Sequence, residues 1–207
     1  MENNRRSYQD ISTLLGYSGT VSDIPREHST GHSPVTVWLT GLSGEGKSSI
    51  AYELEKMLLD DGRCSFVLDA DSMRHRLNSD LGFSRAERKE NSRRTAEVAW
   101  LMNEAGLIVI VACISPFRED REMASRIIGE KNFIEVHVST SAEVCEARDL
   151  KGLYKKARLG LIKEFTHVSS PYEIPLHPEL IIDNHAMPLA EATYLLYNHL
   201  YQRLGLG

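Results

Sequence analysis

The chain has 207 residues, of which 42% are hydrophobic and 26% are charged. This size and balance predict one globular domain with a large buried core and exclude a fully disordered or fibrous chain. The formal net charge is −5, from 24 basic and 29 acidic side chains, which argues against unspecific nucleic-acid binding because such binding needs positive charge to neutralise phosphates.

Nothing in the sequence predicts insertion into a membrane or secretion. The longest purely apolar run, residues 107–114, is far shorter than the roughly 20 residues of a bilayer-spanning helix. The amino terminus carries two arginines without an apolar segment behind them, unlike a secretory signal. Cys64, Cys113 and Cys145 lie far apart without CxxC spacing, so we interpret them as buried reduced thiols rather than metal ligands or disulfides. We therefore expect a cytoplasmic protein.

The composition of the chain changes near residue 34. Residues 1–33 are polar and lack a sustained period, so we expect a flexible leader there and one domain over residues 34–207. Apolar strands are predicted at residues 35–40, 64–68, 107–114, 133–138 and 180–182. Because these strands are apolar throughout and alternate with helical segments, they indicate an α/β fold with a doubly wound, mostly parallel sheet of about five strands and helices on both faces.

The helices between the strands have recognisable stripes and caps. An apolar stripe at residues 50–58 follows the first strand. Two capping boxes are expected, Ser84 with Glu87, opening a helix to about residue 105, and Thr140 with Glu143. The last helix is predicted over residues 188–204.

The strongest signal in the chain is a phosphate-binding loop. Residues 41–48, GLSGEGKS, fit GxxxxGK[ST] between the first strand and the first apolar stripe. Glycines let successive backbone N–H groups turn toward a phosphate chain, and the next helix adds its partial positive charge. Lys47 is predicted to reach the β and γ phosphates, and the Ser48 hydroxyl to hold Mg²⁺. The expected ATP-binding residues are Gly41, Leu42, Ser43, Gly44, Glu45, Gly46, Lys47, Ser48 and Ser49.

Glu45 is unusual in this loop because it places an acid among residues that face phosphate or solvent. We expect its side chain to point outward, and the alternative is that it weakens nucleotide binding. The loop by itself indicates only binding of a nucleoside triphosphate, since GTPases, motor ATPases and small-molecule kinases share it. The acceptor has to be identified from other residues.

Polar residues after the second and third strands form the candidate acceptor site. Asp69 and Asp71 follow the second strand and Ser115 follows the third, at the edge where open α/β sheets bind ligands. One of these carboxylates is expected to orient Mg²⁺ or to accept the proton of an attacking hydroxyl, and a solvated turn is the alternative. Arg88 and Asn91 share one face of the capped helix with Thr95.

Basic residues are concentrated in two segments of this acidic chain. Residues 74–94 hold seven lysines and arginines against three acids, and residues 148–164 hold six against two. In the first segment Arg74 and Arg88 are the expected anion ligands, and Arg85, Lys89 and Arg93 are expected on a solvated face. The second segment is interpreted as a lid that closes on the phosphates, with an exposed helix as the alternative.

Taken together, the motifs resemble the adenylylsulfate kinase (APS kinase) family over about residues 35–183. The resemblance is carried by TGLSGEGKSS, DADSMRHRLNSDLGFSRAERKENSRR, AGLIVIVACISPFREDR, VCEARDLKGLYKKARLG and FTHVSSPYEIPLHPEL, in this order. It implies the P-loop kinase fold with a basic lid. It also implies transfer of the ATP γ-phosphoryl group to the 3′-hydroxyl of adenylyl sulfate, giving 3′-phosphoadenylyl sulfate and ADP in sulfate activation, with Mg²⁺ as cofactor.

The functional residues of the family can be carried over to matching positions. The resemblance implies catalytic roles for Lys47, Asp71 and Ser115 and metal binding by Ser48 and Asp71. Direct in-line transfer is a better physical account than a phosphoserine intermediate at Ser115, because positioning and charge neutralisation suffice. Phe83 and Phe165 would stack on the two faces of the adenine. The implied adenylyl-sulfate contacts are Asp69, Arg74, Phe83, Arg88, Asn91, Ser115, Lys151 and Phe165.

Three positions depart from the family pattern. Glu45 replaces a small residue, Ala70 replaces the glycine of Asp-Gly-Asp, and His167 replaces the glycine of Phe-Thr-Gly. Two alternative functions stay open: a P-loop kinase for another small hydroxyl substrate, and a non-catalytic nucleotide-binding module. The expected partners are ATP and adenylyl sulfate, without nucleic acid or membrane, and the resemblance allows for a homodimer and for functional coupling to an ATP sulfurylase.

Overall fold

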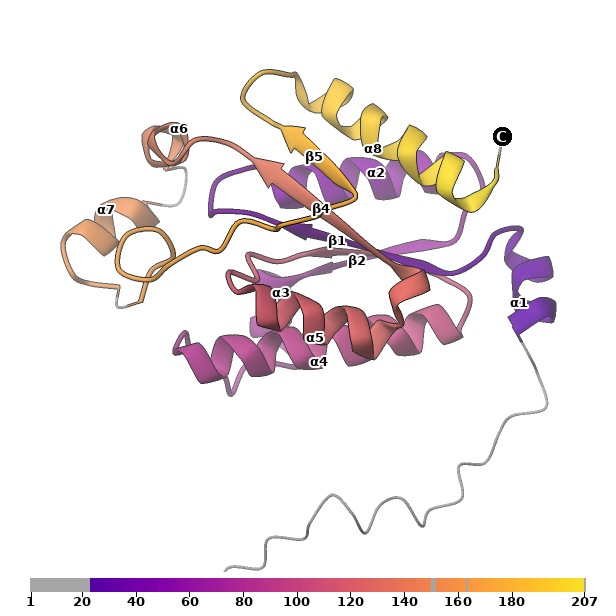
Figure 1. Cartoon of the computed structure of the whole chain (residues 1–207), viewed down its shortest axis with the longest axis horizontal. Helices are drawn as coiled ribbons and strands as arrows, with labels where there is room; N and C mark the ends of the chain where they lie inside the picture. Colours follow the sequence, from indigo (N-terminus) through magenta and orange to yellow (C-terminus); the bar gives the residue numbers. More distant parts are fainter. Residues whose placement is uncertain (1–22, 150–151, 163, 207) are drawn as a thin grey trace, which may run out of the picture.

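The computed structural model describes residues 23–149, 152–162 and 164–206. Five strands form one parallel sheet in the order β2-β3-β1-β4-β5 (Figure 1). The strands are β1 (Val35–Thr40), β2 (Ser65–Asp69), β3 (Ile108–Ala112), β4 (Phe133–Ser139) and β5 (Leu180–Asp183). The predicted fold class is therefore confirmed, and each strand lies within a residue or two of its expected bounds.

Helices cover both faces of this sheet. Helices α2 (Lys47–Asp60) and α8 (Leu189–Leu204) pack on one face, and α4 (Arg85–Glu104) and α5 (Arg118–Ile128) pack on the other (Figure 1). Short helices follow the carboxyl ends of β2 and β4, namely α3 (Ala70–Arg74), α6 (Ala142–Arg148) and α7 (Leu153–Arg158), and a 3₁₀ turn, η2 (Glu130–Asn132), precedes β4. Among the described residues, no helix combines the length and apolar character that crossing a bilayer requires.

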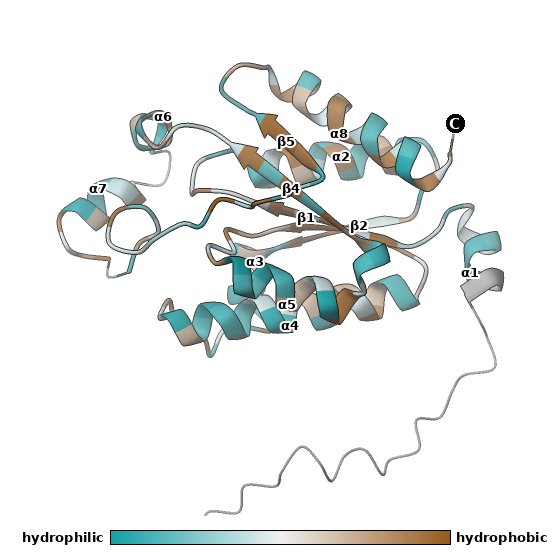
Figure 2. Cartoon of the chain, in the orientation of Figure 1, coloured by the Kyte–Doolittle hydropathy of each residue, from teal (hydrophilic) through white to brown (hydrophobic). Residues whose placement is uncertain are grey.

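The hydrophobic core consists of two layers that the sheet separates. Because alternate side chains of a strand point to opposite faces, Val37 and Leu39 of β1 pack with α2 and α8, whereas Trp38 packs with residues of α4 and α5. Figure 2 shows apolar strands between helices whose outer faces are hydrophilic. Burial on both faces explains why the strands are apolar runs rather than alternating patterns.

Helix α1 (Asp23–Thr30) was not predicted from the sequence. The Thr30 hydroxyl donates to the carbonyl oxygen of Arg26 at 3.1 Å, and the Arg26 guanidinium lies 3.9 Å from the Glu104 carboxylate of α4. A flexible leader was expected through residue 33, whereas residues 23–30 form this helix. Its eight residues, only two turns, are too few for an apolar period to be recognised.

One of the two expected capping boxes is present. Ser84 caps α4, and the Glu87 carboxylate accepts from the Ser84 backbone N–H at 3.1 Å. The second box is wrong, since Ser141 rather than Thr140 caps α6 by accepting from the N–H of Val144. The backbone N–H of Thr140 instead donates to a side chain of the phosphate loop, a contact that no local pattern predicts.

The cysteine prediction holds for two of the three residues. Cys113 and Cys145 are buried, but Cys64 is exposed. Cys64 precedes the first residue of β2, an edge strand of the sheet, so less structure covers it than covers the central strands.

Candidate active site

The candidate residues lie at the carboxyl edge of the sheet. The phosphate loop follows β1 and leads into α2, Asp69 ends β2, Asp71 lies in the next helix, α3, and Ser115 follows β3. In Figure 1 the short helices α6 and α7 lie beyond the carboxyl ends of β4 and β5, at this same edge. Parallel strands thus place segments that are distant in sequence around one site.

Glycine is required in the phosphate loop at two positions. Gly41 and Gly46 have φ angles of 150° and 88°. A Cβ atom on Gly41 would lie 2.4 Å from the carbonyl oxygen of Val138, and one on Gly46 would lie 2.4 Å from Nδ2 of Asn184. Gly46 is also the N-cap residue of α2, so the loop ends where the positive end of that helix begins.

Lys47 is folded back into the loop. Its side chain is almost completely buried, and Nζ donates to the carbonyl oxygens of Gly41 at 2.9 Å and Leu42 at 2.5 Å. Burial lowers the pKa of Lys47, whereas the neighbouring carboxyl group of Glu45 raises it. The ammonium group therefore lies inside the curve of the loop, where it satisfies backbone carbonyls.

The expected outward orientation of Glu45 is wrong. Its side chain is only 2% exposed, and Oε1 accepts a hydrogen bond of 3.2 Å from the backbone N–H of Thr140. Burial raises the pKa of Glu45 to about 7, opposed by Lys47 and by the backbone N–H groups of Thr140 and Leu42. The side chain thus points inward, toward the end of β4.

The hydroxyl of Ser48 is paired with Asp69. Ser48 Oγ donates to Oδ2 of Asp69 at 2.6 Å, and Oδ1 of Asp69 accepts from the backbone N–H groups of Asp71 and Ser72 at the start of α3. Asp69 is buried, whereas Asp71 is exposed. Asp69, which the resemblance assigned to adenylyl sulfate, therefore lies directly beside the expected metal-binding hydroxyl.

Phe83 is surrounded by the two arginines expected to bind anions. The guanidinium of Arg74 lies 4.6 Å from the centroid of the Phe83 ring, and that of Arg88 lies 5.5 Å from it. Arg74 donates to the carbonyl oxygen of Gly82 at 2.6 Å, and Arg88 donates to that of Phe83 at 2.7 Å. Phe83 itself is 52% exposed. The structure thus brings an exposed aromatic ring and two cations together.

Burial and the positive charge of Arg74 lower the pKa of Arg88. Arg88 also reaches the segment after α7, because Nη2 donates to the carbonyl oxygen of Glu164 at 2.8 Å. Glu164 precedes Phe165, so Arg88 links the two phenylalanines expected at the adenine.

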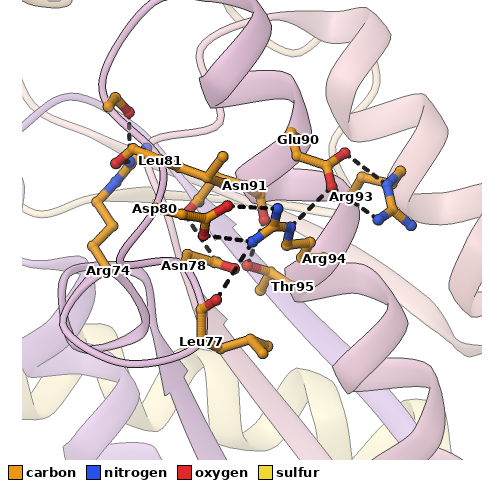
Figure 3. Close-up of polar contacts among 11 residues, drawn as sticks. Arg74, Leu77, Asn78, Asp80, Leu81, Glu90, Asn91, Arg93, Arg94 and Thr95 are labelled. Atoms are coloured by element: carbon orange, nitrogen blue, oxygen red, sulfur yellow. Dashed lines mark hydrogen bonds and ion pairs between the residues drawn. The ribbon is translucent and has the colours of Figure 1, made fainter. Parts of the chain in front are cut away.

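Asn91 is committed to an internal contact. It is buried, its Oδ1 accepts from Nδ2 of Asn78 at 3.0 Å, and its carbonyl oxygen accepts from the Thr95 hydroxyl at 2.8 Å (Figure 3). Asn91 and Thr95 share a face with Arg88 as predicted, and that face packs against the turn after α3.

The other basic residues of α4 form ion pairs at the surface. Figure 3 shows Arg94 between Asp80 and Glu90, with Arg93 on the other side of Glu90. These arginines, Arg93 first, lower the pKa of Glu90 to about 2. Arg85 and Lys89 pair instead with acids of α5.

We expected the Ser115 hydroxyl to contact a substrate, but the structure buries it. The residue is 1% exposed, and Oγ accepts from the indole N–H of Trp38 at 3.0 Å. Its carbonyl oxygen accepts from Arg121 at 2.7 Å, and its φ angle is 37°. The side chain is turned into the protein because this left-handed backbone redirects the chain after β3.

The segment expected to form a lid packs against the phosphate loop. Phe165, 7% exposed, shares a hydrophobic cluster with Leu42, Cys145 and Tyr154. The rings of Phe165 and Tyr154 meet edge to face with centroids 5.0 Å apart, and the Tyr154 hydroxyl donates to the carbonyl oxygen of Ser43 at 2.9 Å. Lys151, expected to contact adenylyl sulfate, lies outside the described residues.

Three residues around the loop were missed by sequence reasoning. Tyr154 contacts Ser43, Thr140 contacts Glu45, and the Asn184 side chain donates to the carbonyl oxygen of Glu45 at 2.6 Å. Asn184 directly follows β5, so a polar residue after the last predicted strand was the one signal available.

Comparisons with known proteins identify close relatives. The family model described as adenylylsulphate kinase matches residues 33–183. A probable adenylyl-sulfate kinase of Halalkalibacterium halodurans is 48% identical over 188 residues, 91% of this chain and 93% of that protein. The adenylyl-sulfate kinase of Geotalea daltonii is 53% identical over 153 residues, 74% of this chain and 75% of that protein.

A solved structure of high similarity is that of the Mycobacterium tuberculosis APS kinase CysC in complex with AMPPNP and APS. It has a TM-score of 0.79 and 44% sequence identity, and the match covers 82% of this chain and 98% of that one.

Proposed function

Because the chain belongs to the adenylylsulphate kinase family and is an ATP-dependent phosphotransferase, we propose that its reaction takes place between the phosphate loop and the Phe83–Arg88 site at the carboxyl edge of the sheet. One observation carries this proposal: Lys47, the Ser48–Asp69 pair and the aromatic and cationic site all lie at that edge. The γ-phosphoryl group of ATP would be transferred to the 3′-hydroxyl of adenylyl sulfate.

Residues 41–49 bind the phosphates of ATP in this proposal. The backbone N–H groups of the loop and the start of α2 face the phosphate chain. Lys47 exchanges its two neutral carbonyl acceptors for phosphate oxygens, which are stronger acceptors for an ammonium group. This exchange draws the cation toward the phosphoryl group that is transferred.

Ser48 and Asp69 are the residues that suit a divalent cation. Both present oxygen atoms, the donors that Mg²⁺ prefers, and one or two such side chains with nucleotide phosphates suffice to bind it. Bound Mg²⁺ supplies neutralisation of phosphate charge. We accordingly assign Asp69 to the metal site with Ser48, and Asp71, which is exposed two residues further on, to the acceptor hydroxyl as its proton acceptor.

The acceptor site consists of Phe83, Arg74 and Arg88. Adenylyl sulfate combines a flat adenine with an anionic phosphosulfate, which an exposed ring beside two guanidinium groups complements. Phe165 belongs to the segment after α7, and Asn91 supports the site through Asn78. Lys151 is assigned to this site by the family resemblance alone. Ser115 acts as a positioning residue, since its buried hydroxyl and fixed backbone favour direct in-line transfer over a phosphoserine intermediate.

The experiment that tests this function is a turnover assay. Purified protein with Mg²⁺ and ATP is supplied with adenylyl sulfate, adenosine, gluconate or shikimate, and ADP release and the phosphorylated product are measured. Of the four acceptors, we expect only adenylyl sulfate to be phosphorylated. We expect turnover to be lost when the metal is chelated and in Lys47→Ala. Turnover with another acceptor would instead support a kinase for a different small hydroxyl substrate.

The Arg88→Ala variant distinguishes binding of adenylyl sulfate from binding of ATP. We expect the KM for adenylyl sulfate to rise about 10- to 100-fold, because a partly shielded charge-assisted bond is worth roughly 1.5 to 3 kcal/mol. The Kd of a non-hydrolysable ATP analogue should change less than about twofold. The matched control is Arg93→Ala, which removes a guanidinium paired with Glu90 on the same helix. Equal KM values for adenylyl sulfate in the two variants would remove Arg88 from the acceptor site.

A further inference from the structure

We propose that Glu45 is a positioning residue of the phosphate loop: its buried carboxyl group holds the loop against the end of β4, and the charge on that carboxyl sets the affinity for ATP. The proposal deepens the assignment of ATP binding to residues 41–49 and rests on it.

Glu45 is attached to two strand ends at once. Its side chain accepts from the backbone N–H of Thr140, 95 residues further along, and its carbonyl oxygen accepts from the Asn184 side chain, 139 residues further along. Thr140 and Asn184 directly follow the neighbouring strands β4 and β5. The middle of the loop is therefore fixed to the sheet through one residue.

The carboxyl group fills the space beside the first glycine of the loop. A Cβ atom on Gly41 would lie 1.9 Å from Oε2 of Glu45. This Oε2 is buried and has no hydrogen-bond partner among the described residues, and neither has the buried Thr140 hydroxyl. An ionised carboxylate with one unpaired buried oxygen is costly, so the site favours the neutral acid. The same burial raises the pKa of Glu45 to about 7.

The titratable groups around Glu45 come from several elements. They are Lys47 on α2, Cys145 on α6, Tyr154 on α7 and Tyr172 from the segment before β5. Burial raises the pKa of Cys145 to about 11 and raises the pKa of both tyrosines further, while it lowers the pKa of Lys47. The thiol and the phenols are therefore neutral near pH 7, where Glu45 titrates.

ATP and the ionised carboxylate oppose each other. The nucleotide brings several negative charges to a loop whose middle residue is Glu45, and like charges favour the neutral acid. Thermodynamic linkage is reciprocal. If bound ATP increases the protonation of Glu45, then protonation of Glu45 increases the affinity for ATP. ATP affinity should consequently fall as the pH rises through the pKa of Glu45.

The test measures binding of a magnesium-loaded, non-hydrolysable ATP analogue by calorimetry between pH 6 and 8.5. For the unaltered protein we expect Kd to rise about tenfold over this range, and for Glu45→Gln we expect a change of less than about twofold. Glutamine keeps an acceptor for Thr140 and cannot ionise, so it isolates the charge. Any effect of Lys47 deprotonation on Kd would appear in both proteins. Parallel pH profiles for the two would overturn the role of the charge.

The positioning role is tested at pH 6, where Glu45 is mostly neutral. We expect Glu45→Ala to bind the analogue at least about fivefold more weakly than Glu45→Gln, because it lacks the acceptor for Thr140. Circular dichroism is used to check that both variants are folded. Equal affinity of the two would overturn the positioning role. These binding measurements contain no adenylyl sulfate. Failure of the unaltered protein to phosphorylate adenylyl sulfate would therefore count against the proposed function and not against this inference.

Discussion

Among single residues, Glu164 and His167 have an unusual backbone on either side of Phe165. Their φ angles are 54° and 75°, in the left-handed region. A side chain with a Cβ atom avoids this region because the Cβ crowds the carbonyl oxygen, at a cost of about 1 to 2 kcal/mol per residue. The segment that holds Phe165 in its hydrophobic cluster is therefore under strain, as is common in segments that serve a binding site.

Glycine at position 167 should relieve part of this strain. We expect His167→Gly to raise the free energy of unfolding by about 0.5 to 1 kcal/mol, since relief of the left-handed backbone exceeds the entropy that glycine loses on folding. Urea unfolding followed by circular dichroism measures the change. The control is His167→Ala, which removes the imidazole but keeps a Cβ atom. A gain of the same size in the alanine variant would show that backbone strain is not its origin.

At the scale of elements, α4 and α5 are joined by charge across the face of the sheet. Arg85 of α4 donates to both carboxylate oxygens of Asp120 on α5, at 2.7 and 2.8 Å, and its guanidinium lies 3.8 Å from the ring centroid of Phe117. Lys89 pairs with Glu119, which is mostly exposed. Arg85 and Lys89 of α4 therefore pair with acids of α5, whereas Arg88 lies at the candidate site.

The two ion pairs should differ in their effect on stability. Asp120 is completely buried, so Arg85→Ala leaves a buried carboxylate without its cation, and we expect a loss of about 2 kcal/mol, discounted because Arg85 is partly exposed. Lys89→Ala removes an exposed pair from the same two helices and should cost clearly less. Thermal unfolding of both variants compares them. Losses of equal size would mean that burial of Asp120 does not govern the energy of this contact.

For the molecule as a whole, residues of the carboxyl-terminal half of the chain support the phosphate loop, which lies in the amino-terminal half. Thr140 and Asn184 contact Glu45, and Tyr154 contacts Ser43, so residues after β4, on α7 and after β5 all hold the loop that follows β1. Parallel strands end at one edge, which allows such distant residues to meet there. Nucleotide affinity should thus depend on residues near the carboxyl terminus.

Asn184→Ala tests this dependence. We expect the Kd for an ATP analogue to rise about fivefold, because the carbonyl oxygen of Glu45 loses its donor and the loop loses one of these three contacts, while the free energy of unfolding falls by only about 1 kcal/mol. Asn198→Ala, on α8, serves as the control and should leave ATP binding unchanged. If stability falls in Asn184→Ala without any change in affinity, the contact is structural alone.

Local patterns made most of the fold predictable. Apolar runs marked all five strands, and the capping box at Ser84 marked the start of α4. Residues 41–48 and the motifs after β2 were sufficient for the family, because glycine turns and residue spacing are properties of a short stretch of chain. Helix α1 and the cap of α6 were missed, since a short helix has little periodicity and adjacent Thr140 and Ser141 are equivalent candidates for a cap.

Only the tertiary structure decided how the candidate side chains are used. Glu45 points inward, the Ser115 hydroxyl is buried and accepts from Trp38, and Ser48 pairs with Asp69. Each outcome depends on a partner from another strand or helix, and a partner 21 to 95 residues away leaves no trace in local spacing. The sequence by itself thus determined the strands, the phosphate loop and the family, and packing determined the orientation of the side chains that surround the nucleotide.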